Sequence, residues 1–201
     1  CFIGCPWSPP AAMKTNGDDR NGGKLKTSMY DDFARFLAQW VKKFKQEVGV
    51  DLYAISPQNE PRFEQSFRSC VYTPEELRDL VIEIGKEFDN QNLDTKILVA
   101  DDMLAAWKTI PMIQTSVSDP VAGPYVDGMA VHGYSNGVNP TPSTEAAAYW
   151  GAGRGLSDYA AVTGKTTWMT ETSGYDDNWT DGMDLASTIY IALKYGKISR
   201  W

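Results

Sequence analysis

Two glutamates, Glu60 and Glu171, stand at the ends of two apolar, strand-like segments, DLYAIS (51–56) and TTWMTE (166–171). Two carboxyl groups on opposite sides of a sugar can cleave a glycosidic bond. One protonates the leaving oxygen, and the other attacks the anomeric carbon or activates water. Since the chain has 26 acidic residues, the alternative is that both glutamates are ordinary solvated side chains. Which of the two holds depends on the strands and helices that position these glutamates.

The surrounding sequence alternates between strand and helix patterns. We expect strands at 1–5, 51–56, 95–101, 126–134, 166–171 and 197–201. We expect helices at 27–48, from 74 to about 88, at 103–114 interrupted by Pro111, at 143–162 in broken form, and in a last segment ending at Gly196. Strands that alternate with helices predict parallel β-α units.

Two of these helices carry clear end signals. The first has Phe33, Leu37 and Trp40 at helical spacing and a glycine, Gly49, directly after its last turn. The second begins at Thr73, followed by a proline and then by Glu76 at the third helical position. This pattern predicts a capping box.

Two architectures fit parallel β-α units: an open doubly wound sheet and a closed eight-stranded barrel. The glycine-rich segment GDDRNGGK (17–24) has neither the dinucleotide-binding spacing nor the P-loop spacing. Polar and aromatic residues instead follow the strands: Trp7, Asn59, Glu60, Asp101, Asp102, His132, Tyr134 and Glu171. Such residues at strand ends favour the active-site face of a (β/α)8 TIM barrel.

The chain is too short to close that barrel. The 201 residues supply five β-α units and one further strand, whereas a closed barrel needs eight units and about 250 residues. The sequence therefore predicts one partial catalytic domain over residues 1–201. Across an eight-stranded ring, three units separate Glu60 from Glu171, so the two can face one substrate.

Composition excludes several other classes of function. The net charge is −7 and the isoelectric point near 4.7, which argues against nucleic-acid binding. No run approaches the ~18 apolar residues of a membrane span. Three cysteines without C-x-x-C spacing and a single histidine predict neither a disulfide framework nor a metal site, although pairing of Cys5 with Cys70 stays open. We expect no cofactor.

Five segments together resemble glycoside hydrolase family 30, a family of retaining β-glycosidases of clan A. They are CPWSPPAAMKTNG (5–17), DLYAISPQNEP (51–61), VADDM (99–103), AVHGYS (130–135) and WMTETSG (168–174). The resemblance implies that the chain holds barrel strands 3 to 7 and the start of strand 8. Strands 1 and 2 and the β-sandwich side domain would be absent, so we expect a piece of a longer enzyme.

The resemblance also implies roles for the catalytic pair. Glu60 is expected to act as the acid/base and Glu171 as the nucleophile. Asn59 would hydrogen-bond the sugar 2-hydroxyl, and Trp7 would stack on the sugar in the −1 subsite. Alternatives stay open for the last two, since Asn59 could cap the strand-end loop and Trp7 could be a core aromatic.

Two residues of the fourth expected strand complete the predicted substrate site. The resemblance implies that Tyr134 orients the nucleophile. His132 lies two residues earlier on the same strand face, and we assign it a supporting role in the substrate site. A lone histidine is also compatible with a core position. Asp101 and Asp102 are adjacent, so only one of them can face the barrel interior.

These observations predict a retaining glycoside hydrolase that acts on a β-linked glycan or glycoside. Xylanase, β-1,6-glucanase and glucosylceramidase types are all open. The Asp101-Asp102 pair resembles the Asp-Asp of glucosylceramidase-like members of the family, which mildly favours the last type. The alternatives are a cellulase-like enzyme of clan A and a carbohydrate-binding or catalytically incompetent barrel. We expect a carbohydrate substrate, a monomer in the full-length form, and a secreted or extracytoplasmic location, although no signal-peptide pattern opens the chain.

Overall fold

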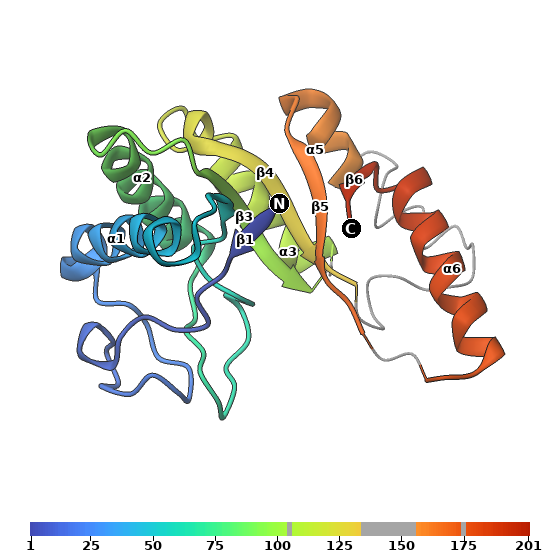
Figure 1. The fold of residues 1–201 in the computed structure, drawn as a ribbon, viewed down its shortest axis with the longest axis horizontal. Coiled ribbons are helices and arrows are strands. Elements are labelled where there is room, and N and C mark those ends of the chain that lie inside the picture. Colours follow the sequence, from blue (N-terminus) through green and yellow to red (C-terminus); the bar gives the residue numbers. More distant parts are fainter. Residues whose placement is uncertain (104–105, 134–155, 174–175) are drawn as a thin grey trace.

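The computed structural model describes residues 1–103, 106–133, 156–173 and 176–201, which form a curved parallel sheet with helices along its outer face (Figure 1). In this part of the chain the sheet has six strands, β1 to β6, paired in sequence order and all parallel. The strands are β1 (Phe2–Gly4), β2 (Leu52–Ile55), β3 (Lys96–Met103), β4 (Val126–His132), β5 (Thr166–Glu171) and β6 (Ile198–Arg200). This is the topology of an incomplete (β/α)8 barrel, as predicted.

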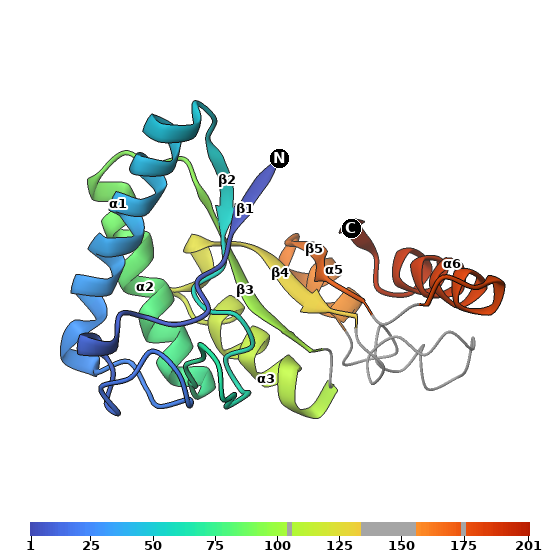
Figure 2. The same cartoon turned by 60° about the horizontal axis from the view of Figure 1, so that its bottom comes forward.

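The helices connect consecutive strands. They are α1 (Tyr30–Val48), α2 (Pro74–Asn90), α3 (Ala106–Val117), α5 (Leu156–Thr163) and α6 (Trp179–Lys194), with single 3-10 turns at Ala11–Met13, Thr27–Met29 and Gly123–Tyr125. Figure 2 shows α1 and α2 side by side along one flank of the sheet, while α6 stands at the opposite end. None of the described helices is long and apolar enough to cross a membrane.

Among the described residues, buried apolar side chains form two separate clusters, one on each face of the sheet. The large cluster lies between the strands and the helices and includes Leu37, Leu80 and Val131. The small cluster consists of Ala54, Leu98, Ala130 and Trp168, with Tyr53 packed against it. Alternate residues of β2, β3 and β4 thus point to opposite faces, and the small cluster fills the concave interior of the half-barrel.

The predicted helix ends are confirmed. The Thr73 side chain accepts a hydrogen bond from the Glu76 backbone N–H at 3.2 Å, and the Glu76 carboxylate accepts one from the Thr73 N–H at 2.7 Å. Helix α1 ends at Gly49, whose φ of 78° is left-handed, a conformation that glycine adopts without steric cost.

One expected interruption is wrong. Helix α3 continues through Pro111 to Val117, although proline removes a hydrogen bond from the helix interior. Its neighbours Ile110, Met112 and Ile113 are buried in the large cluster, and their packing outweighs the lost bond. Of the helix expected at 143–162, only the part in α5 can be compared, because residues 143–155 lie outside the described residues.

The two outer strands leave apolar side chains exposed. Phe2 and Ile3 on β1 are 54% and 41% exposed, and Trp201 after β6 is 44% exposed. Each of these strands pairs on one side only in the described sheet. The half-barrel is therefore open along both edges.

Replacing Thr73 by alanine should lower the free energy of unfolding by about 1 kcal/mol, because the N–H groups at the start of α2 lose their acceptor. Thr73→Ser keeps the hydroxyl and serves as the matched control. Urea denaturation followed by circular dichroism measures both variants. Equal losses in the two would show that the capping box does not stabilise α2.

Candidate active site

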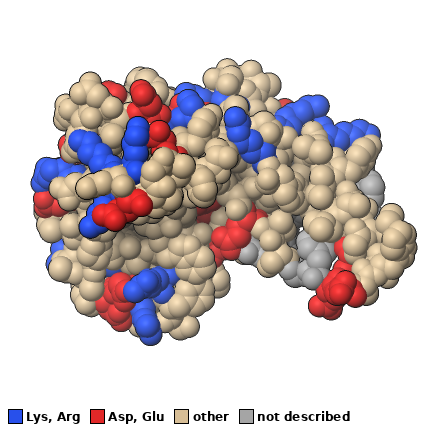
Figure 3. Space-filling model, in the orientation of Figure 1, with Lys and Arg blue, Asp and Glu red and all other residues tan. Residues whose placement is uncertain are grey.

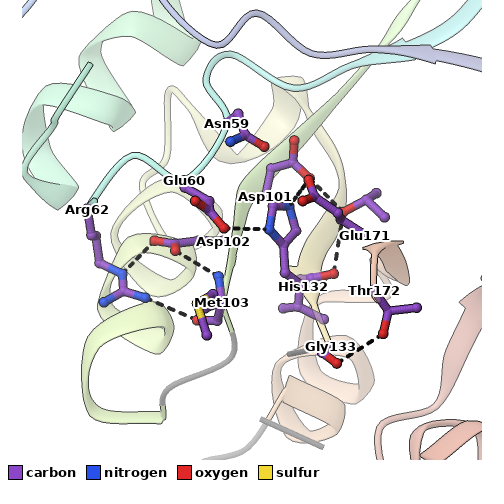
Figure 4. A network of polar contacts seen from close by, with 12 residues as sticks. Asn59, Glu60, Arg62, Asp101, Asp102, Met103, His132, Gly133, Glu171 and Thr172 are labelled. Atoms are coloured by element: carbon purple, nitrogen blue, oxygen red, sulfur yellow. Dashed lines mark hydrogen bonds and ion pairs between the residues drawn. The ribbon is translucent and has the colours of Figure 1, made fainter. Parts of the chain in front are cut away.

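Four acidic or basic side chains converge where the strands end, as Figure 4 shows. Glu60 lies in the loop after β2, Asp101 near the end of β3, His132 at the end of β4 and Glu171 at the end of β5. The carboxyl ends of parallel strands lie at the same edge of a sheet. The fold therefore brings together residues that are far apart in the sequence.

His132 sits at the centre of this group and contacts three carboxylates. Its Nδ1 lies 3.1 Å from Oε1 of Glu60, and its Nε2 lies 3.3 Å from Oδ1 of Asp101 and 3.6 Å from Oε2 of Glu171. The imidazole is only 1% exposed. Both ring nitrogens thus have acidic partners away from solvent.

These partners decide the protonation state of His132. Burial lowers the pKa of His132, but hydrogen bonds to Asp101 and Glu60 and the negative charge nearby outweigh it and raise the pKa to about 10. Burial raises the pKa of Asp101, but the hydrogen bond and charge of His132 outweigh it and leave the pKa below its ordinary value. At neutral pH the centre of the site is an imidazolium bonded to a carboxylate.

A β-bulge in β3 aims Asp101 at His132. Ala100 and Asp101 have φ angles of 74° and 49°, and the register with β4 shifts between Ala100 and Asp102. Left-handed angles are uncommon for residues other than glycine, and bulges re-aim side chains next to active sites. Asp101 also accepts hydrogen bonds from the Cys5 thiol at 2.8 Å and the Thr170 hydroxyl at 2.6 Å.

Asp102 points instead to Arg62, in agreement with the expectation that only one of the two aspartates faces the interior. Arg62 Nε lies 2.6 Å from Oδ2 of Asp102, and the guanidinium also donates to the Met103 carbonyl at 3.0 Å. Burial raises the pKa of Asp102, and the Arg62 charge offsets only part of this. Because Arg62 follows Glu60 by two residues, this ion pair ties the Glu60 loop to β3.

The backbone of Glu60 is fixed as well. Its N–H donates to the Asp101 carbonyl at 2.9 Å, and its own carbonyl accepts from the Phe63 N–H at 2.9 Å. Its φ of 43° is left-handed, which costs free energy for a glutamate. Neighbouring contacts therefore hold Glu60 in a conformation that it would rarely adopt alone.

A pocket of about 250 Å³ opens beside these groups. Trp7, Asn59, Asp101, His132 and Glu171 are among the residues that line it. An oxygen of Glu60 and an oxygen of Glu171 lie within 4.8 Å of one another. Figure 3 shows acidic side chains at a hollow near the middle of the molecule.

The remaining residues predicted for the site are placed as follows. Asn59 is 6% exposed and its backbone N–H donates to the Pro6 carbonyl at 3.0 Å. Trp7 is 42% exposed, and its ring centroid lies 5.5 Å from that of Phe67. The Tyr134 position lies outside the described residues. Cys5 and Cys70 are both free thiols.

Among the described residues, one set of three potential metal ligands is found: Glu60, His132 and Glu171. A histidine binds a metal through an unprotonated nitrogen. In this site the two ring nitrogens face Glu60 and Asp101, which stabilise a proton on each. The donor set therefore opposes metal binding.

The family of the chain follows from comparison with known proteins. The family model described as the glycosyl hydrolase family 30 TIM-barrel domain matches residues 1–201. The chain belongs to this family. The resemblance seen in five sequence segments is thereby confirmed, and so is the barrel class.

Individual relatives support the same family. Lysosomal acid glucosylceramidase of Mus musculus is 32% identical over 150 residues, which are 69% of this chain and 28% of that protein. Glucuronoxylanase XynC of Bacillus subtilis (strain 168) is 27% identical over 201 residues, 95% of this chain and 42% of that protein. The family 30 xylanase Xyn30A from Clostridium acetobutylicum matches with a TM-score of 0.79 at 26% identity, over 98% of this chain and 46% of that one.

The chain thus spans less than half of the length of each of these proteins.

The sequence did not reveal two residues close to Glu60. Arg62 contacts Asp102, and Gln65 contacts Glu60. Neither belongs to a segment with a recognisable motif. Their partners become visible only when the loop is folded against β3.

Replacing Arg62 by methionine should lower the free energy of unfolding by about 3–5 kcal/mol, because it leaves the buried Asp102 carboxyl without its cation. Arg68→Met is the matched control. It breaks an exposed ion pair with Asp19, whose loss should cost under about 1 kcal/mol. Chemical denaturation measures both, and similar losses would contradict a stabilising role for the buried pair.

The stability that His132 contributes should depend on pH. Its pKa rises from about 6.5 in the unfolded chain to about 10 in the folded one. Its contribution is therefore full below pH 6.5 and is lost as the pH rises towards 10. The difference in unfolding free energy between wild type and His132→Asn should be larger at pH 6 than at pH 10 by more than about 1.4 kcal/mol. A pH-independent difference would contradict the charged form.

Proposed function

We propose that this chain is part of a retaining glycoside hydrolase that cleaves a β-linked glycan or glycoside through a glycosyl-enzyme intermediate. One observation carries the proposal: oxygens of Glu60 and Glu171 lie within 4.8 Å of one another at the mouth of the barrel. Carboxyl groups of retaining enzymes are about 5–5.5 Å apart, whereas those of inverting enzymes are about 6.5–9.5 Å apart to admit a water molecule. The short separation favours direct attack by one carboxylate.

Glu171 is the proposed nucleophile and Glu60 the proposed acid/base. In the first step Glu171 attacks the anomeric carbon while Glu60 gives a proton to the departing glycosidic oxygen. In the second step Glu60 takes a proton from water, and this water releases the sugar from Glu171. Glu60 is the more buried of the two carboxylates, with 10% of its side chain exposed against 34% for Glu171.

The imidazolium of His132 stabilises the two carboxylates beside each other. It lies between Glu60 and Glu171, so its charge reduces the repulsion between two acidic groups at close range. His132 also lines the pocket, and we propose for it the supporting role expected from the sequence. As Glu171 loses its charge in the glycosyl-enzyme, His132 remains paired with Asp101.

The other predicted residues have positions that suit sugar binding. Asn59 lines the pocket one residue before the acid/base, and we propose that it binds the 2-hydroxyl, where a hydrogen bond strengthens in the transition state. Trp7 lines the same pocket and offers an aromatic face for stacking. Tyr134 remains proposed from the sequence alone.

The relatives narrow the substrate to a class. They are named as a glucosylceramidase, a glucuronoxylanase and a xylanase, so we propose a β-linked glycan or glycoside without choosing among these types. We also propose that the full-length protein is a secreted or extracytoplasmic monomer. A barrel that binds sugars without cleaving them is the alternative that an activity assay separates.

The stereochemistry of the reaction tests this proposal. A protein that carries residues 1–201 within a complete barrel is incubated with xylan, β-1,6-glucan and aryl β-glycosides, and proton NMR follows the first product. We expect the β-anomer to appear first and the α-anomer to appear only by mutarotation. If the α-anomer appears first, the retaining mechanism is wrong; if sugars bind but none is cleaved, the enzymatic proposal is wrong.

A further inference from the structure

The two oxygens of the Glu60 carboxyl have different partners. Oε1 faces His132, which lines the pocket together with Glu171. Oε2 accepts a hydrogen bond from the side-chain amide of Gln65, five residues further along the same loop. Gln65 is 8% exposed. Both oxygens of the carboxyl group are thus held, and its rotation about the Cγ–Cδ bond is restricted.

Gln65 itself occupies a fixed position. Its N–H donates to Oγ of Ser69 at 3.1 Å, and its carbonyl lies 2.9 Å from the same oxygen. Ser69 Oγ also accepts from the Gly22 N–H at 3.0 Å, and the Ser69 carbonyl accepts from the ammonium of Lys14 at 2.6 Å. Lys14 is fully buried. The loop between β2 and α2 is therefore clamped by the segment that follows β1.

The hydrogen bond from Gln65 influences which oxygen of Glu60 faces the substrate. The glycosidic oxygen must lie between the two catalytic carboxyl groups, and Oε1 is the Glu60 oxygen on the His132 side, where Glu171 also lies. An amide N–H can only donate, so Gln65 holds Oε2 towards the loop. Oε1 also accepts from His132, but its second lone pair can still carry the exchanged proton. A misplaced acid slows proton transfer more than it slows substrate binding.

We propose that Gln65 is a positioning residue for the acid/base, which anchors Oε2 so that Oε1 exchanges the proton. The inference rests on the proposed function. In the first step the proton leaves Oε1 for the glycosidic oxygen as its bond to the anomeric carbon breaks and the bond from Glu171 forms. In the second step water returns a proton to Oε1 as its oxygen bonds to the anomeric carbon and Glu171 departs.

Leaving groups of different acidity separate this role from a structural one. A 2,4-dinitrophenolate departs without protonation, whereas a phenolate or a sugar alkoxide needs the acid. For Gln65→Met, measured in a complete barrel carrying residues 1–201, we expect kcat/KM for phenyl β-glucoside or β-xyloside to fall at least about tenfold. For the 2,4-dinitrophenyl glycosides we expect a change of less than about twofold, since acid catalysis contributes little there.

Two further variants complete the experiment. Glu64→Gln changes the exposed neighbour of Gln65 and should leave both activities as in the wild type. Gln65→Asn keeps an amide but is one methylene shorter, so its donor no longer reaches Oε2; it should show the same selective loss even if Gln65→Met does not fold. Equal losses on both kinds of glycoside, or no loss, in the folded variants would overturn the role of Gln65. A wild-type protein that cleaves none of the glycosides would overturn the proposed function with it.

Discussion

One buried imidazolium surrounded by three carboxylates is the interaction on which the site depends. Glu60, Asp101 and Glu171 all lie within 3.6 Å of a ring nitrogen of His132. Carboxylates at such close range repel one another, and burial opposes their ionisation. The positive charge of His132, the only histidine of the chain, reduces the repulsion among these three carboxylates.

The fold keeps this arrangement rigid with devices that lie outside the pocket. The bulge at Ala100 and Asp101 turns one aspartate to His132 and leaves Asp102 for Arg62. The Arg62 ion pair and the Gln65 hydrogen bond then hold the loop of Glu60 on two sides. Such neighbours lock the rotamer of Glu60, which its proposed role as acid/base requires. Contacts outside the pocket therefore fix the positions of the side chains within it.

Much of this was predictable from periodicity and end signals. The alternation of strands and helices, the capping box at Thr73 and the placement of Glu60 and Glu171 at strand ends follow from local patterns. The bulge was not predictable, because it puts a left-handed angle on Ala100 as well as on Asp101, and alanine rarely adopts such an angle. Gln65 was missed for another reason: its role depends on a loop conformation that Ser69 fixes.

In the proposed mechanism Glu171 forms a covalent bond to the sugar while Glu60 serves as acid/base. The most direct measurement incubates a complete barrel carrying residues 1–201 with 2-deoxy-2-fluoro-β-glucosyl and β-xylosyl fluorides, then maps the adduct by peptide mass spectrometry. The fluorine slows release of the sugar more than departure of the fluoride, so the intermediate accumulates. We expect an added fluorosugar on the peptide that contains Glu171, and none in Glu171→Gln. An adduct on Glu60 or on any other residue would contradict this mechanism.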